Sequence, residues 1–185
     1  MRRTRDTLIL GLCLALLFCY AGSAKAESTS SGGTPTTARL DFRITIPTIL
    51  YLQVGTAGTT RDLVTFAVTD VPGSGAVAGT SSGTNPVPVR VAALVGAAAT
   101  VTLRADSSSP LTNGSTTIPF TEISWTAAGN FSSGAFSGAA AQQLDQFTGP
   151  GNRTGSYAFS YANNNYYPAT VAPYNGTVTY TLSSP

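Results

Sequence analysis

The sequence predicts an all-β protein built as one antiparallel β-sandwich of about nine strands. Three observations support this class. In many short segments apolar residues alternate with polar ones, which is the period of a strand with one buried face. Turns rich in Gly, Ser, Thr and Pro separate these segments at the spacing that sandwiches show. The 185 residues also contain no helical pattern longer than two turns and no alternation of strands and helices of the kind that parallel sheets require.

The first 26 residues have the features of a secretory signal peptide. A basic start precedes an apolar stretch over residues 8–20, and Ala24-Lys25-Ala26 fits the small-x-small rule of signal peptidase. We therefore expect cleavage after Ala26 and export to the periplasm, the cell surface or the medium. The apolar stretch is shorter than the roughly 20 residues of a spanning helix, and no later segment reaches that length. No membrane span is expected in the mature chain.

The composition of the chain after residue 26 excludes several classes of function. Both cysteines, Cys13 and Cys19, lie in the leader, so the mature chain has neither Cys nor His. Thiol chemistry, disulfides and the common zinc ligand sets are therefore absent. Six arginines accompany seven acidic residues, with no basic patch to bind nucleic acid. The acids show no pair of the kind that a glycosidase needs, so we expect a non-enzyme without metal or cofactor.

The sandwich is expected to span residues 38–185. Residues 27–37 are small, polar and aperiodic, which is typical of a flexible leader. The first predicted strand covers 38–46 and ends at Pro47, because proline cannot donate to a ladder. It carries four apolar residues at period two: Leu40, Phe42, Ile44 and Ile46.

The remaining strands follow the same alternation. The stretch 71–85 is rich in Gly, Ser and Thr and predicts a loop, and the run 139–147 predicts a short helical turn. Trp125 is expected in the core. Further strands are predicted at 49–54, 63–70, 87–92, 101–104, 118–126, 156–161 and 174–182.

A turn near the C-terminus carries a second set of candidate residues, which are Asn163, Asn164, Asn165, Tyr166 and Tyr167. Tyrosine rings stack on sugars and amides hydrogen-bond to them, so a glycan-binding turn is one interpretation. The alternative is that the neighbouring tyrosines belong to strands while the asparagines satisfy the positive φ of a tight turn.

The leader peptide, the Ser/Thr/Gly-rich sandwich, the alternating strand at 40–46 and the closing segment Asn175–Leu182 together resemble a known group. They look like secreted fimbrial-type subunits of the chaperone–usher route, especially the archaic, spore-coat-U-like branch. The resemblance implies an incomplete immunoglobulin-like fold that a neighbouring subunit completes by donating a strand. It also implies self-assembly or assembly with related subunits, and a periplasmic chaperone. Leu40, Phe42, Ile44 and Ile46 would enter successive pockets of the neighbour, with 27–37 as their tether.

A rival interpretation remains for the same strand. Residues 38–46 run almost directly into 49–54, which favours the interpretation that they are the first strand of their own domain. The sequence therefore predicts an exported structural or adhesive surface protein. In one interpretation this protein is a fimbrial-type subunit assembled by strand donation. The alternative function is a soluble periplasmic or extracellular β-sandwich that binds a carbohydrate or another ligand.

Overall fold

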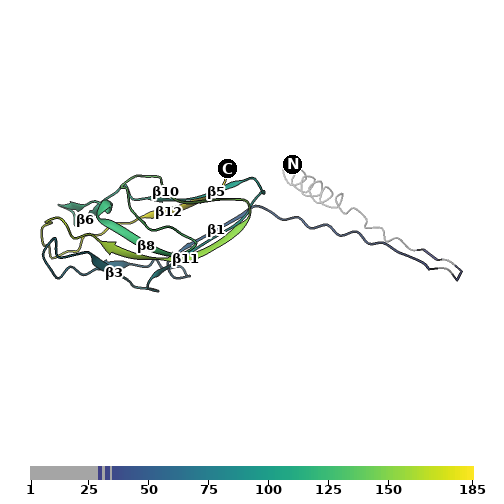
Figure 1. Cartoon of the computed structure of the whole chain (residues 1–185), viewed down its shortest axis with the longest axis horizontal. Helices are drawn as coiled ribbons and strands as arrows, with labels where there is room; N and C mark the ends of the chain where they lie inside the picture. The colour runs from purple at the N-terminus through teal and green to yellow at the C-terminus, as the bar shows by residue number, and fades with distance from the viewer. Residues whose placement is uncertain (1–28, 31, 34) are drawn as a thin grey trace, which may run out of the picture. The chain divides into compact units, whose positions relative to one another are not determined.

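The structure is a computed structural model that describes residues 29–185 except 31 and 34. The predicted signal peptide lies outside the described residues. Residues 46–185 form one compact unit. The described part contains twelve β-strands and one 3₁₀ turn, with no α-helix and no helix suited to cross a membrane (Figure 1). The prediction of an all-β, antiparallel protein is confirmed.

The larger sheet is organised around β11 (Gly151–Tyr161). One edge of β11 pairs first with β4 (Val87–Leu94) and then, near its end, with β3 (Val77–Ser81). The opposite edge pairs with β8 (Ile123–Gly129). Three short strands extend this sheet outward, and all their pairings are antiparallel: β1 (Ile49–Val54), β2 (Val64–Phe66) and β9 (Gly134–Ala135).

The second layer is a sheet of three strands. Its centre is β5 (Thr100–Asp106), which lies between β10 (Gln142–Thr148) and β12 (Thr179–Ser183). A small hairpin of β6 (Leu111–Thr112) and β7 (Thr117–Ile118) stands apart from both sheets. The 3₁₀ turn η2 (Phe120–Glu122) leads directly into β8.

Several predicted elements differ from the structure. The predicted strand at 63–70 is reduced to β2, and the one at 118–126 is interrupted by the 3₁₀ turn η2. The helical turn predicted over 139–147 is wrong, because most of that run pairs with β5 as strand β10. The predicted loop at 71–85 contains β3, whose small residues are held by pairing with β2 and β11. The predicted strand at 174–182 is interrupted: Asn175 forms an isolated bridge with Thr112, and β12 begins at Thr179. Residues 176–178 consequently carry no ladder pairing.

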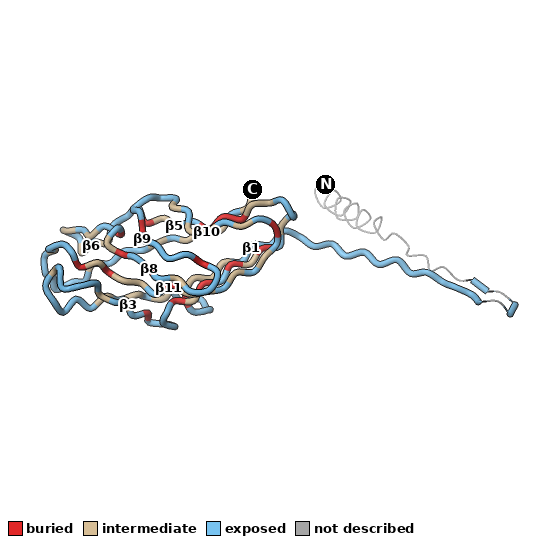
Figure 2. The backbone as a smooth tube through the Cα atoms, viewed as in Figure 1, coloured by how far each residue is buried: buried red, intermediate tan, exposed pale blue. Residues whose placement is uncertain are grey.

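The two sheets enclose an aromatic core. Trp125 is 6 % exposed, as predicted, and its ring centroid lies 5.0 Å from that of Phe136 and 5.6 Å from that of Tyr157. Its indole Nε1 donates to the carbonyl of Ser132 at 3.0 Å, so burial leaves no polar atom of this side chain unpaired. Figure 2 shows that the buried residues lie mainly in the strands and that most of the loops are exposed.

Residues 38–46 do not form the strand that the sequence predicts. None of the twelve strands includes them, and the first strand of the sandwich is β1. The four alternating apolar side chains are 67–85 % exposed. The alternation identified a face suited to burial, but periodicity carries no information on whether the burying sheet belongs to the same chain.

Unfolding should become easier at high pH because of Tyr157. Its ring is 2 % exposed, and burial together with the charge of Asp145 raises the pKa of Tyr157 to about 12, against about 10 in an unfolded chain. Because the folded-state pKa is the higher one, this stabilisation is complete below about pH 10 and is lost as the pH rises towards 12.

We expect urea unfolding to show a falling free energy between about pH 10 and 12, and Tyr157→Phe to reduce that slope. The reduction is partial, because burial also raises the pKa of Tyr180. Tyr166→Phe is the matched control, since the Tyr166 side chain is 82 % exposed. Equal slopes in the two variants would show that the burial of Tyr157 does not govern the alkaline transition.

Candidate functional site

An apolar groove with a volume of ≈ 680 Å³ opens where the two layers meet without pairing. One wall comes from β1 and β2 of the larger sheet, and the other from residues 176–180, the last two of which begin β12. Core aromatic side chains line its floor, including Phe120, Phe136 and Phe159. We call it the sheet-edge groove, and its apolar walls are formed by Leu52, Val54, Val64, Phe66, Val178 and Tyr180.

Strand register explains why β1 contributes apolar side chains to the groove. Leu52 and Val54 lie opposite Val91 and Val89 of β4, which are among the most buried residues of the core. Side chains two positions apart on a strand share a face, so Leu52 and Val54 face the inside of the sandwich. Their outer neighbour, Tyr51, faces the opposite side.

Two glycines allow the groove walls to lie close to the core. A Cβ on Gly79 would lie 2.7 Å from Cγ1 of Val64 and 2.8 Å from Cε1 of Phe66. A Cβ on Gly176 would lie 2.9 Å from Cζ of Phe120. All three distances are shorter than those that carbon atoms tolerate, so glycine allows β2 and the 176–178 segment to pack where they do.

The strands beside the groove have free edges. Among the described residues, β1 pairs with β4 alone, β2 with β3 alone and β12 with β5 alone. β1 and β12 approach each other, yet they share no ladder. A strand edge with unpaired N–H and C=O groups is a template for another strand. The groove thus offers backbone hydrogen bonds as well as apolar surface.

Charged residues lie at the rim of the groove. Arg61 and Asp62 belong to its lining, and the carboxylate of Asp62 accepts a hydrogen bond from the backbone N–H of Thr56 at 2.7 Å. An apolar surface with a polar rim is typical of a protein-binding site. The arrangement suits an extended apolar segment better than a small polar substrate.

The first residue of the asparagine turn, Asn163, is buried and hydrogen-bonded to another loop of the domain. Asn163 is 3 % exposed and has a φ of 49°, in the left-handed region that asparagine tolerates. Its Nδ2 donates to the carbonyl of Val71 at 3.3 Å, and its own carbonyl accepts from the N–H of Gly73 at 2.8 Å. Asn163 therefore joins this turn to the 71–73 loop.

Of the next residues of the turn, two are hydrogen-bonded within the domain and two have exposed side chains without such a bond to a described residue. Asn165 Nδ2 and the Tyr167 hydroxyl both donate to Oε1 of Glu122, at 2.5 and 3.3 Å. Burial, followed by the charge of Glu122, raises the pKa of Tyr167. Asn164 and Tyr166 stay exposed. The five candidate residues do not form one flat platform, and glycan binding at this turn stays a prediction.

Sequence reasoning identified the exposed alternating segment but missed the sheet-edge groove. The groove is lined by residues from β1, β2 and 176–180, which are far apart in the sequence. The interruption of the last strand at Gly176 is the one local signal. Within residues 29–185, as far as the structure describes them, no group of three or more acidic side chains is arranged to hold a metal ion.

Comparison of the chain with family models, with curated proteins and with solved structures finds no match.

Proposed function

We propose that this chain is a structural subunit of an exported surface polymer of fimbrial type, assembled by strand donation. Residues 40–46 of one subunit fill the sheet-edge groove of the next and complete an immunoglobulin-like sandwich. The observation that supports this is complementarity. One chain carries an apolar groove between unpaired strands and, in a separate segment, four apolar side chains at period two that are 67–85 % exposed.

The exposure of the segment favours a partner. Fully burying a Leu, Ile or Phe side chain gains about 1.5–3 kcal/mol, and residues 40–46 forgo this gain four times in the isolated chain. An extended apolar strand left in water also invites aggregation. A strand that adds to a sheet edge gains backbone hydrogen bonds and places alternate side chains in pockets.

Donation to another copy is favoured over folding back beside β1. Pro47 and Thr48 are the two residues between Ile46 and β1. A two-residue hairpin needs a type I′ or II′ turn, in which the first central residue has a positive φ. Proline is fixed near −65°, so this linker cannot form such a hairpin.

The groove must be protected before the proposed assembly takes place. An exported monomer exposes both an apolar groove and an apolar strand, so a periplasmic chaperone that covers the groove before assembly is part of the proposal. The function is structural or adhesive, and none of the chemistry expected of an enzyme is required for it.

The test is the native mass distribution of the exported protein before and after boiling in detergent. The full chain should give a ladder that collapses to the monomer on boiling, because a donated strand resists detergent until its host unfolds. Deletion of residues 27–46 should abolish the ladder and leave an aggregation-prone sandwich. A single monomer species in both conditions, or a stable and well-folded deletion product, would contradict strand donation and favour a self-contained ligand-binding module.

A further inference from the structure

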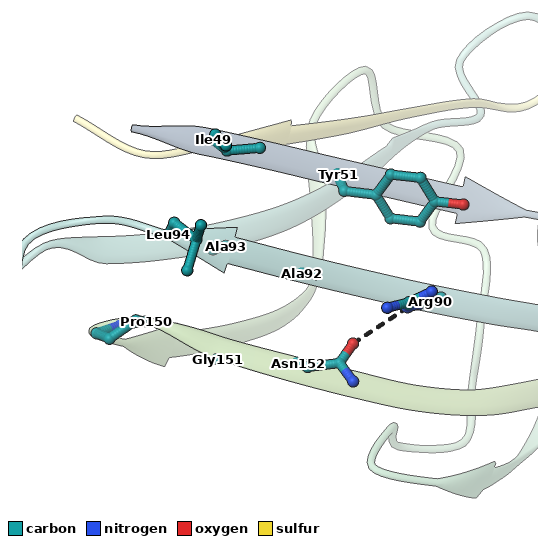
Figure 3. A pocket seen from close by; sticks show the side chains of 9 residues that line it. All are labelled: Ile49, Tyr51, Arg90, Ala92, Ala93, Leu94, Pro150, Gly151 and Asn152. Atoms are coloured by element: carbon teal, nitrogen blue, oxygen red, sulfur yellow. Dashed lines mark hydrogen bonds between the residues drawn. The ribbon is translucent and has the colours of Figure 1, made fainter. Parts of the chain in front are cut away.

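The outer face of the larger sheet carries a shallow hollow on the side opposite to the sheet-edge groove. It has a volume of ≈ 470 Å³ and lies over β1, β4 and the start of β11 (Figure 3). Register places Tyr51 and Asn152 on either side of Ala92. Since Ala92 has the shortest side chain of this row, it forms the bottom of the hollow.

One end of the hollow is apolar. Ile49 of β1 lies opposite Leu94 of β4, and both are almost half exposed, at 47 and 45 %. Pro150 completes this row. Ile49, Leu94 and Pro150 together form an apolar ledge. This ledge lies beside the ring of Tyr51, which is itself 42 % exposed, and offers a ligand apolar surface.

The other end holds a positioned cation. The Arg90 guanidinium carbon lies 5.3 Å from the centroid of the Tyr51 ring, and its Nε donates to Oδ1 of Asn152 at 3.2 Å, as Figure 3 shows. The Tyr51 hydroxyl is in turn held by Oε1 of Gln53 at 2.9 Å. Contacts on two sides restrict the rotamers of Arg90, which lowers the entropy cost of binding a ligand.

The positioned cation has no counter-ion in the described part of the chain. The ion pair found there joins Arg153 to Asp145, and no described residue accepts a hydrogen bond from the terminal nitrogens of Arg90. The Asn152 amide nitrogen is likewise without an acceptor among these residues. A planar guanidinium with both terminal nitrogens available binds a carboxylate in a bidentate manner.

We propose that this hollow binds an acidic sugar, meaning a uronic or sialic acid unit of a glycan. The carboxylate would pair with Arg90, ring hydroxyls would accept from Asn152, and the C–H face of the ring would lie on Ala92 and the Leu94 ledge. A volume of ≈ 470 Å³ falls within the range of about 300–1,000 Å³ that is typical of small-ligand sites. A single cation beside apolar surface suits one carboxylate on a ring better than a phosphate-rich ligand.

The test measures binding of the full exported protein to two acidic probes, a galacturonic acid trisaccharide and 3′-sialyllactose. Neutral counterparts are the fully methyl-esterified trisaccharide and lactose. We expect at least one acidic probe to bind about 10- to 100-fold more tightly than its neutral counterpart, as a charge-assisted pair contributes. Arg90→Gln should lose the same factor, and Tyr51→Ala should weaken binding several-fold.

Arg104→Gln is the matched control, because Arg104 is an exposed arginine of β5 in the other sheet and should bind as the unchanged protein does. Equal affinities of the Arg90 and Arg104 variants would overturn the proposal. So would equal affinity for acetate and the sugar acids, or no binding of either acidic probe at about 10 mM. Arg90→Gln should leave the detergent-resistant ladder intact, so failure of this site and failure of strand donation are distinguishable.

Discussion

Replacing Phe42 or Ile44 with aspartate should abolish the strand-donated assembly that we propose. Each substitution removes an apolar side chain that is 85 % exposed in the free chain and would be buried in the sheet-edge groove. It loses about 1.5–3 kcal/mol of burial and adds the desolvation of a carboxylate, which costs several kcal/mol more. Because each 1.4 kcal/mol is a factor of ten, association should weaken by roughly a thousandfold or more. Detergent electrophoresis without boiling should show monomer in place of the ladder.

The matched control is Thr45→Asp in the same segment. Thr45 alternates with Ile44 and Ile46, so it would point away from the groove when Ile44 points into it. The same charge at this position should leave the ladder close to that of the unchanged protein. Loss of assembly in both variants would show that the segment does not bind with alternate side chains buried. Retention of the ladder in Phe42→Asp and Ile44→Asp would exclude the segment as the donor.

Strands with alternating apolar residues were predictable from the sequence. The predicted strand at 49–54 coincides with β1, and the one at 87–92 covers most of β4. Both carry bulky inward-facing side chains, whose period of two is visible without any knowledge of their partners. The core position of Trp125 followed from the same alternation.

Two of the strands that the sequence did not predict, β3 and β10, are determined by pairing and not by local preference. β3 (Val77–Ser81) consists largely of Ala, Gly, Thr and Ser, which are weak strand signals alone and are held here between β2 and β11. β10 has a register irregularity between Gln143 and Asp145, which breaks the alternation and obscured the strand.

The two halves of the candidate assembly site differ in how far the sequence predicts them. The proposed donor residues could be found from the sequence because they form one continuous alternating run. The groove is a space between strands that lie far apart in the chain. An unpaired strand edge leaves no pattern in the local sequence, so the groove could not be predicted from it. The same holds for Arg90: its pairing with Tyr51 and Asn152 depends on the register of three strands.

A synthetic peptide of residues 38–48 should stabilise the protein that lacks residues 27–46. If the peptide fills the groove, its binding to the folded state adds about 2.7 kcal/mol when its concentration is 100 times Kd. For a domain of this size, that corresponds to a rise in Tm of about 5–10 °C. Circular dichroism during heating measures the shift. Should the deletion protein aggregate, the yield of soluble monomer on refolding with the peptide gives the same information.

A peptide of identical length that carries Phe42→Asp and Ile44→Asp is the control, and it should neither raise Tm nor rescue solubility. Amide hydrogen exchange locates the binding site of the peptide. The peptide should protect the backbone N–H groups of residues 176–180 and of β2, which border the groove. Equal effects of the two peptides would show that the peptide binds non-specifically and would contradict the proposed site. Rescue by the unchanged peptide alone would show that the groove accepts the chain's own segment, and a second copy would then suffice as the partner in assembly.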